Sequence, residues 1–204
     1  MAGTISWKET QSSGSVQDKT LTIGASGLSL AQPLPTSASA SYVTITELGI
    51  GPEHLTKVVV SGLPITLGNT TGVSFGSVGL ITFPKALIHI PSVSVVSFLF
   101  DYTDDAGNVT PLTGTMGGDF SLGSTATSDA TLDGTDVNIL ASTSYDPFST
   151  AVTANSAINA VLDGTTTAIT CYINALVDDG DVSDGASDVV EIGGTFYFKW
   201  YVIR

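Results

Sequence analysis

Apolar and polar side chains alternate at every second position through most of the chain from Tyr42 onward. This period is typical of β-strands that have one covered face. It begins at Val43 and Ile45 and resumes at 58–60, after the Gly-rich turn at 49–52 and a possible single helical turn at 53–56. The pattern predicts an all-β fold, a β-sandwich or jelly-roll-like domain over residues 42–204.

The longest predicted strand runs from Leu87 to Tyr102 and is apolar on both parities. One parity holds Ile88, Ile90, Val96, Phe98 and Phe100, and the other holds Val93, Val95 and Leu99. A strand covered on both sides lies centrally in packed sheets, or one of its faces meets another subunit. Pro91 cannot donate a ladder hydrogen bond, so we expect a bulge or an edge there, and the run could be two strands.

The last residues of the chain predict a final strand. Phe196, Phe198, Trp200 and Val202 share one parity and form its predicted inner, aromatic face. The segment 150–162 is the only one with plausible helical spacing.

Residues 1–41 differ from the rest because they hold small polar residues and prolines, which offer little surface to bury. We predict an extended N-terminal arm with one short strand at Thr20–Ile23. Leu28 and Leu30 are predicted to anchor the arm on a neighbouring subunit.

Charge excludes several kinds of chemistry. The chain has a net charge of −13, and between Lys85 and Lys199 it has no Lys or Arg but fifteen Asp or Glu. Phosphates, nucleic acid and most anionic substrates are held by Arg or Lys. We therefore expect no nucleic-acid partner, and the sequence contains no cofactor-binding motif.

Cysteine and targeting signals add little. Cys171 is alone and lies in an apolar run, where a buried thiol is expected. The first residues lack a basic segment followed by an apolar one, and no apolar stretch reaches the length of a membrane span, so we expect no secretion signal. We expect synthesis in a cytoplasm and no membrane partner.

One motif could carry catalysis. Gly72, Ser74 and Gly76 fit the G-x-S-x-G pattern of a hydrolase nucleophile elbow, which needs a helix after the serine. A strand pattern follows instead, so a hydrolase using Ser74 is a minor alternative and we expect no enzyme. The available bases would be His54, predicted to be exposed, and His89, predicted to be a hydrogen-bonded structural histidine in a strand.

Two acidic clusters could bind a cation. The segment 178–188 has aspartates at some Ca²⁺-loop positions, but Asp184 and Val190 stand where an EF-hand needs Gly and Glu. A solvated acidic loop is the favoured interpretation, and a weak cation site the alternative. The cluster of Asp101, Asp104, Asp105 and Asn108 is equally well a hairpin turn. Two Leu-Asp-Gly-Thr repeats, at 132–135 and 162–165, predict tight turns.

Several segments together resemble a family of tailed-bacteriophage virion proteins of similar length, whose relatives look like head decoration, or cement, proteins. The segments are Val43–Glu47, Gly51, His54–Val58, Gly79–Pro84, Ala86–Ile88, Phe120–Gly123, Asp129–Thr135, Ile173–Ala175 and Ile192–Thr195. The resemblance covers residues 42–204, and its motifs are structural.

The resemblance implies a β-sandwich or jelly-roll module that sits as a trimer on an icosahedral shell and binds the major capsid protein. The expected location is the capsid surface of a virion. Val93, Val95 and Leu99 are the predicted subunit contacts. A tail or fibre module that binds a host glycan is the alternative.

Overall fold

The computed structural model describes residues 3–10, 16–24, 27–29, 34–48, 53–70, 73–103, 109–111, 117–145, 152–157, 159–177 and 189–203. The chain forms two compact units, Met1–Pro33 and Leu34–Arg204. The boundary was predicted at residue 41 but lies at 33, because residues 36 and 37 already pair within the second unit.

The first unit is an antiparallel sheet in the order β1-β2-β3. Its strands are β1 (Gly3–Thr10), β2 (Val16–Gly24) and β3 (Gly27–Ser29). The predicted short strand at Thr20–Ile23 falls inside β2. These residues pair with each other as a hairpin and a third strand, in the segment where an extended arm with one short strand was predicted.

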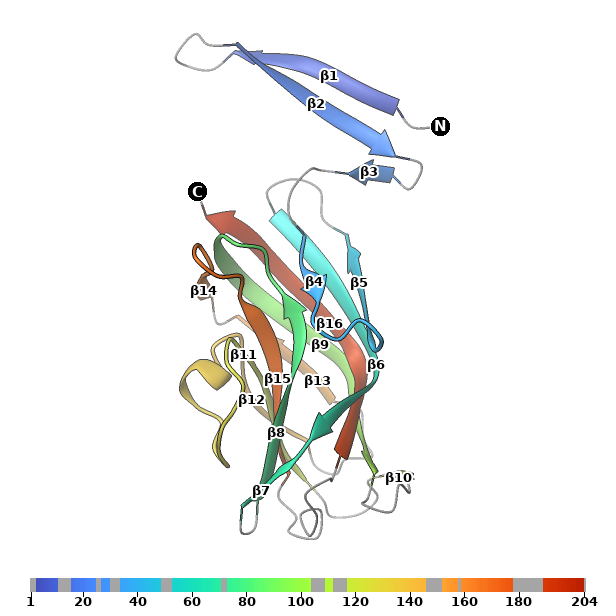
Figure 1. The fold of residues 1–204 in the computed structure, drawn as a ribbon, viewed down its shortest axis with the longest axis vertical. Helices are drawn as coiled ribbons and strands as arrows, with labels where there is room; N and C mark the ends of the chain where they lie inside the picture. Colours follow the sequence, from blue (N-terminus) through green and yellow to red (C-terminus); the bar gives the residue numbers. More distant parts are fainter. Residues whose placement is uncertain are drawn as a thin grey trace. The chain divides into compact units, whose positions relative to one another are not determined.

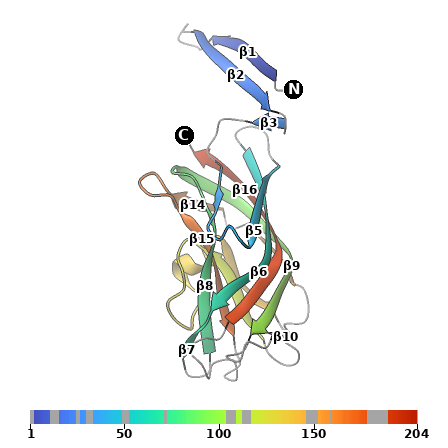
Figure 2. The ribbon, with the colours of Figure 1, turned by 45° about the vertical axis from the view of Figure 1, so that its right-hand side comes forward.

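The second unit packs two antiparallel sheets face to face, as Figures 1 and 2 show. Sheet I has the order β10-β9-β16-β6-β5, and β13 and β14 also pair with β9. Its strands are β5 (Val43–Glu47), β6 (Glu53–Thr66), β9 (Leu87–Thr103), β10 (Val109–Pro111), β13 (Val152–Ser156), β14 (Ala160–Asp163) and β16 (Val189–Ile203).

Sheet II has the order β12-β11-β15-β8-β4, and β7 also pairs with β8. Its strands are β4 (Thr36–Ser37), β7 (Gly68–Thr70), β8 (Val73–Thr82), β11 (Gly118–Gly123), β12 (Leu140–Tyr145) and β15 (Thr170–Val177). A 3₁₀ turn (η1, Gly134–Asp136) lies between β11 and β12. The predicted all-β class is confirmed.

The strand pairs are nested along the sequence. β6 pairs with β16, β8 with β15, β9 with β13 and β14, and β11 with β12, so that each pair lies inside the one before it. Successive pairs alternate between sheet I and sheet II. A long antiparallel hairpin wound in this way into two sheets is a jelly roll.

Aromatic side chains fill the space between the sheets. Phe98 of sheet I stacks on Phe120 of sheet II with ring centroids 4.0 Å apart, and Phe100 stacks on Tyr145 at 4.2 Å. Edge-to-face and offset stacking add to the burial of apolar area. The predicted inner face of the last strand is confirmed, since residues 196, 198 and 200 are fully buried.

The side chains of β9 that face the core switch twice between even-numbered and odd-numbered residues. Its pairing with β16 slips by one residue around Pro91, where a bulge was expected, and slips again at Ser97, which has φ 54°. Val93 and Val95 therefore point into the core, as do the phenylalanines that follow the second slip, while Leu99 points outward. The prediction that Val93 and Val95 share an outer face with Leu99 is wrong, because a single extra residue moves every later side chain to the other face.

The second slip continues across the sheet. Strand β6 carries an extra residue at Gly62 (φ 63°), and Gly194 of β16 (φ 150°) lies between it and Ser97 of β9. A Cβ at Gly194 would lie 3.2 Å from the backbone of the neighbouring β9. Sheet I therefore bends where three adjacent strands are irregular at one level.

Two predicted helical segments are strands. Residues 53–56 begin β6, and the segment 150–162 contains β13 and β14. The turn between β13 and β14 includes Asn159 at φ 55°, which asparagine tolerates better than most residues. Both strands pair with β9, so tertiary pairing overrides the local helical spacing.

The two positions Val93 and Leu99 test the parity of β9. Val93→Ala should lower the free energy of unfolding by about 1–3 kcal/mol, because it leaves a cavity in the core. Leu99→Ala should change it by less than about 0.5 kcal/mol, as at other exposed sites. Urea denaturation of both variants measures this, and equal losses would contradict the two slips.

Candidate functional site: a buried polar cluster and two unlike sheet faces

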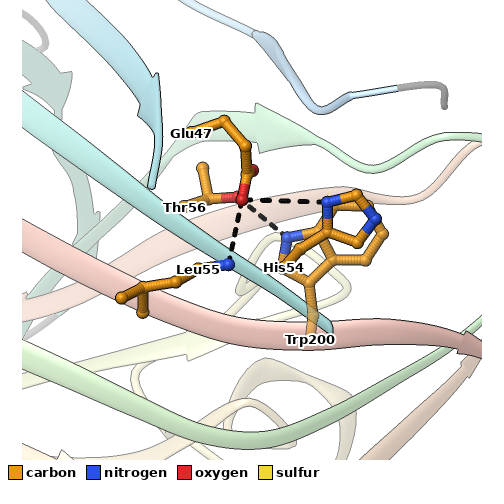
Figure 3. A network of polar contacts seen from close by, with 5 residues as sticks. All are labelled: Glu47, His54, Leu55, Thr56 and Trp200. Atoms are coloured by element: carbon orange, nitrogen blue, oxygen red, sulfur yellow. Dashed lines mark hydrogen bonds and ion pairs between the residues drawn. The ribbon is translucent and has the colours of Figure 1, made fainter. Parts of the chain in front are cut away.

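A polar cluster joins β5, β6 and β16 at one end of sheet I (Figure 3). The two carboxylate oxygens of Glu47 accept hydrogen bonds from the Leu55 N–H at 2.9 Å and the Thr56 hydroxyl at 2.7 Å. The Trp200 indole N–H donates to the same Thr56 oxygen at 2.8 Å. The Thr56 hydroxyl thus links the edge strand β5 to the central strand β16.

His54 belongs to the same cluster. Its ring stacks on Trp200 with centroids 4.0 Å apart and planes inclined by 10° (Figure 3). Its Nδ1 lies 3.8 Å from a Glu47 oxygen, a distance for an ion pair of the protonated ring and not for a hydrogen bond. The prediction of an exposed His54 is wrong, since only 3% of the residue is exposed.

The geometry of this cluster suits a structural role. A general base must reach a substrate proton, whereas His54 and Thr56 are buried and both oxygens of Glu47 accept hydrogen bonds from the chain itself. The charge-assisted hydrogen bonds of a carboxylate are stronger than neutral ones. The cluster therefore fastens β5 to sheet I.

Ser74 has none of the geometry of a nucleophile elbow. It lies inside the continuous strand β8, fully buried, and its hydroxyl has no hydrogen-bond partner among the described residues. His54 and His89 belong to sheet I, whereas Ser74 belongs to sheet II. The structure brings neither histidine to this serine, so the geometry of the described residues gives the hydrolase alternative no support.

The other candidate residues have structural roles or lie outside the described part of the chain. His89 hydrogen-bonds through Nδ1 to the Tyr201 hydroxyl on the neighbouring strand, which confirms its predicted role. Burial raises the pKa of the Cys171 thiol, which keeps it protonated. The acidic segment 178–188 lies outside the described residues, and residues 101–103 pair with β10 as a hairpin strand.

Metal ligands and membrane helices were sought in the described part of the chain. Within it, no three His, Cys, Asp or Glu side chains gather as a metal site. Nor does it contain a helix of the length and apolarity that crossing a bilayer requires.

Part of the outer face of sheet II is covered by the chain itself. Asn174 points outward from β15 yet is fully buried, and its side chain hydrogen-bonds to the segment 124–139. The amide of Asn174 donates to the carbonyls of Thr125 and Asp136, and its oxygen accepts from the Ser77 hydroxyl and the Thr127 N–H. All the hydrogen-bonding groups of this amide are therefore used within the sheet and its covering segment.

The outer face of sheet I, here named the open face, has a different character. Of the nine large apolar side chains that are exposed in the described part of the chain, eight project from it. They are Tyr42, Leu48, Leu55, Val59, Val96, Leu99, Val161 and Ile203, each at least 36% exposed. Contiguous exposed apolar side chains mark interaction surfaces in soluble proteins.

The residues of the open face form rows across the strands. Val59 of β6 faces Thr195 of β16, which in turn faces Val96 of β9. Lys57 lies one row away, beside Tyr197. The face therefore combines aliphatic, hydroxyl and cationic groups on three adjacent strands.

Two of the six cations of the chain lie on the open face. Lys199 pairs with Glu53 at 3.2 Å, both being well exposed. Lys57 forms no ion pair with another described residue. Glu53, Glu191 and Asp163 project from the same face, so three carboxylates accompany the two lysines.

The predicted subunit-contact residues are distributed differently. Leu99 lies on the open face, whereas Val93 and Val95 are in the core. Leu28 lies in β3, and its side chain is outside the described part, as is the whole of Leu30. Sequence reasoning missed other members of the open face, although the central valine of the run 58–60 has the outward parity and could have indicated it.

Thr56 tests the polar cluster. Thr56→Val should destabilise the fold by about 1–3 kcal/mol, because the Trp200 indole N–H and one Glu47 oxygen lose their partner inside the protein. Thr44→Val is the matched control on an exposed site of β5, and it should stay within about 0.5 kcal/mol of the parent. Thermal and urea unfolding measure both, and a neutral Thr56→Val variant would show that the cluster does not fasten β5.

The chain was compared with known proteins by sequence and by structure. No family model, no curated protein and no solved structure matches it.

Proposed function

We propose that this chain is a structural protein of a tailed-bacteriophage virion, which binds the outer surface of the head as an oligomer and stabilises the shell. The observation that carries the proposal is the contrast between the two sheet faces. On sheet II the outward Asn174 is covered by the chain itself and all its hydrogen-bonding groups are used, whereas sheet I leaves several large apolar side chains exposed on its open face. A domain that leaves apolar side chains exposed on one sheet suits assembly.

The resemblance to decoration proteins suggests which assembly the domain joins. The segments that resemble decoration proteins fall in the strands and turns of the jelly roll, and the family implies trimers on a shell of major capsid protein. Jelly rolls serve as viral capsid modules. Two polar clusters of the described part, around Glu47 and around Asn174, hold strands and a covering segment together.

The stabilisation would come from mass action and not from chemistry. A protein that binds the intact shell but not its separated subunits stabilises the shell by RT ln(1 + [L]/Kd). The acidic surface limits contact with nucleic acid, because phosphates repel it. Within this proposal the chain makes and breaks no bond.

The proposal is tested on particles of the phage that encodes this chain. Heads and tails are separated on density gradients, and the chain is quantified in each fraction by mass spectrometry. We expect it in the heads, and we expect heads that lack it to rupture at a lower temperature and to regain stability when the purified chain is added. Recovery with tails alone would favour the glycan-binding tail or fibre module, and absence from both fractions would refute a virion role.

A further inference from the structure

We propose that the open face binds a neutral oligosaccharide along one row of side chains, here named the polar row. The polar row crosses four adjacent strands of sheet I and consists of Lys57 of β6, Tyr197 of β16, Ser94 of β9 and Asn155 of β13. This sugar-binding activity goes beyond the proposed function and does not depend on it. Val59 and Val96 lie in the next row, so the aliphatic part of the open face remains available for assembly.

The polar row has unused hydrogen-bonding groups. None of its four side chains has a hydrogen-bond or ion-pair partner among the residues that the structure describes. Asn174 on sheet II shows the opposite case, since all the donors and acceptors of its amide are used within the protein. An ammonium, a phenol, a hydroxyl and an amide together offer donors and acceptors to a ligand. This mixture suits sugar hydroxyl groups, because each of them both donates and accepts.

Two partly exposed tyrosines lie on the outward side of β16. Tyr197 belongs to the polar row, and Tyr201 follows four residues later, about 13 Å along the strand. The Tyr201 hydroxyl hydrogen-bonds to Nδ1 of His89, and the two rings meet edge to face with centroids 4.6 Å apart. The orientation of the Tyr201 ring is therefore set before a ligand arrives, which lowers the entropic cost of binding.

Tyrosine rings are suited to the apolar side of a sugar. The face of an aromatic ring carries partial negative charge, and the C–H groups on one side of a hexose ring are attracted to it. Tyr197 therefore offers a stacking surface in the same row as the free polar groups of Lys57 and Ser94. A ligand that stacks on this ring brings its hydroxyl groups within reach of both neighbours.

Charge favours a neutral ligand. The chain carries −13, and Glu53, Glu191 and Asp163 project from the open face. An anionic ligand, such as a sialylated glycan or a nucleic acid, is repelled by this excess of carboxylates. An uncharged oligosaccharide approaches without repulsion, and its hydroxyl groups bind ammonium and carboxylate groups equally well.

The composition of the polar row favours a sugar over a protein partner. β16 is the middle strand of sheet I, and Lys57 and Ser94 flank its Tyr197 on the two neighbouring strands. Lysine and serine are depleted in protein–protein interfaces relative to the rest of the surface, whereas tyrosine is enriched. A protein that covered this row would bury an ammonium and a hydroxyl at the centre of the contact, which costs free energy unless both are paired.

The full-length chain is first applied to an array of immobilised hexose and N-acetylhexosamine oligosaccharides, with sialylated oligosaccharides as the anionic set. We expect binding to neutral members of the array and not to the anionic set. The neutral hexasaccharide that binds most tightly is then titrated by calorimetry, which gives its Kd. Raising the salt concentration should leave this Kd unchanged, because an uncharged ligand makes no ion pair with the chain.

Tyrosine substitutions on the two sheets provide matched variants. Tyr197→Ala should raise the Kd at least about ten-fold, because the stacking surface is lost. Tyr197→Phe keeps the ring and should raise the Kd less than Tyr197→Ala does. Tyr172→Ala is the control, since Tyr172 is also partly exposed but projects from β15 of sheet II, and it should leave the Kd unchanged.

Asn155→Ala tests the hydrogen-bonding part at an exposed position of β13. It should raise the Kd about three-fold or more, because the sugar loses the hydrogen bonds of one amide. Thermal unfolding of each variant checks that the jelly roll is intact.

Binding of neutral oligosaccharides with the expected losses supports the inference. It is overturned by the absence of binding, by a preference for sialylated oligosaccharides, or by equal losses in Tyr197→Ala and Tyr172→Ala. An oligomer that Tyr197→Ala dissociates in the absence of sugar would assign the polar row to protein contact and overturn it too. The fractionation of heads and tails is independent of these measurements: a chain that is found in heads and binds no sugar leaves the proposed function standing.

Discussion

The pairing of β16 with both β6 and β9 is the interaction on which the rest of the structure depends. Without β16, sheet I would consist of two separate parts, β5 with β6 and β9 with its short partners. β16 also supplies the Trp200 indole that bonds Thr56, and the aromatic side chains that meet Phe83 of the opposite side of the core. Because the paired strands are far apart in sequence, the chain must close a long loop before these contacts form, which is typical of slow-folding β topologies.

The same strand determines the character of the open face. Its outward side chains, among them Thr195, Tyr197 and Lys199, lie between those of β6 and those of β9. The inward aromatic residues hold β16 in the core, and β16 pairs with β6 and β9 on its two edges. Lys57 of β6 and Val96 of β9 therefore lie on the same surface. Sheet II shows the alternative solution, in which Asn174 and a covering segment use the outward polar groups internally.

How far the sequence predicts the structure depends on whether a strand is regular. In β16 the inward residues keep one parity from Val190 to Trp200, so simple alternation identified its buried face. In β9 each of two extra residues reverses which alternate side chains face the core. The one at Pro91 has a sequence signal, the missing N–H, whereas Ser97 adopts a positive φ that serine rarely prefers and that only its neighbours in the sheet explain.

The burial of His54 escaped prediction for a related reason. Its position after a turn suggested exposure, but its ring stacks on Trp200, which comes from the last strand and lies far from His54 in sequence. Local spacing carries no information on such a pairing.

The acidic composition and the open face have a common physical consequence. A chain with few cations has few places where a copy can approach without repulsion, so the position of each lysine strongly affects which contact forms. Apolar area alone would favour many modes of association, whereas Lys57 and the Lys199 pair sit among the exposed aliphatic side chains of one sheet. Three carboxylates, Glu53, Glu191 and Asp163, project from the same face, so its two lysines do not make it cationic. The acidic excess over the whole chain disfavours unspecific approach of another copy and helps to keep the protein dispersed.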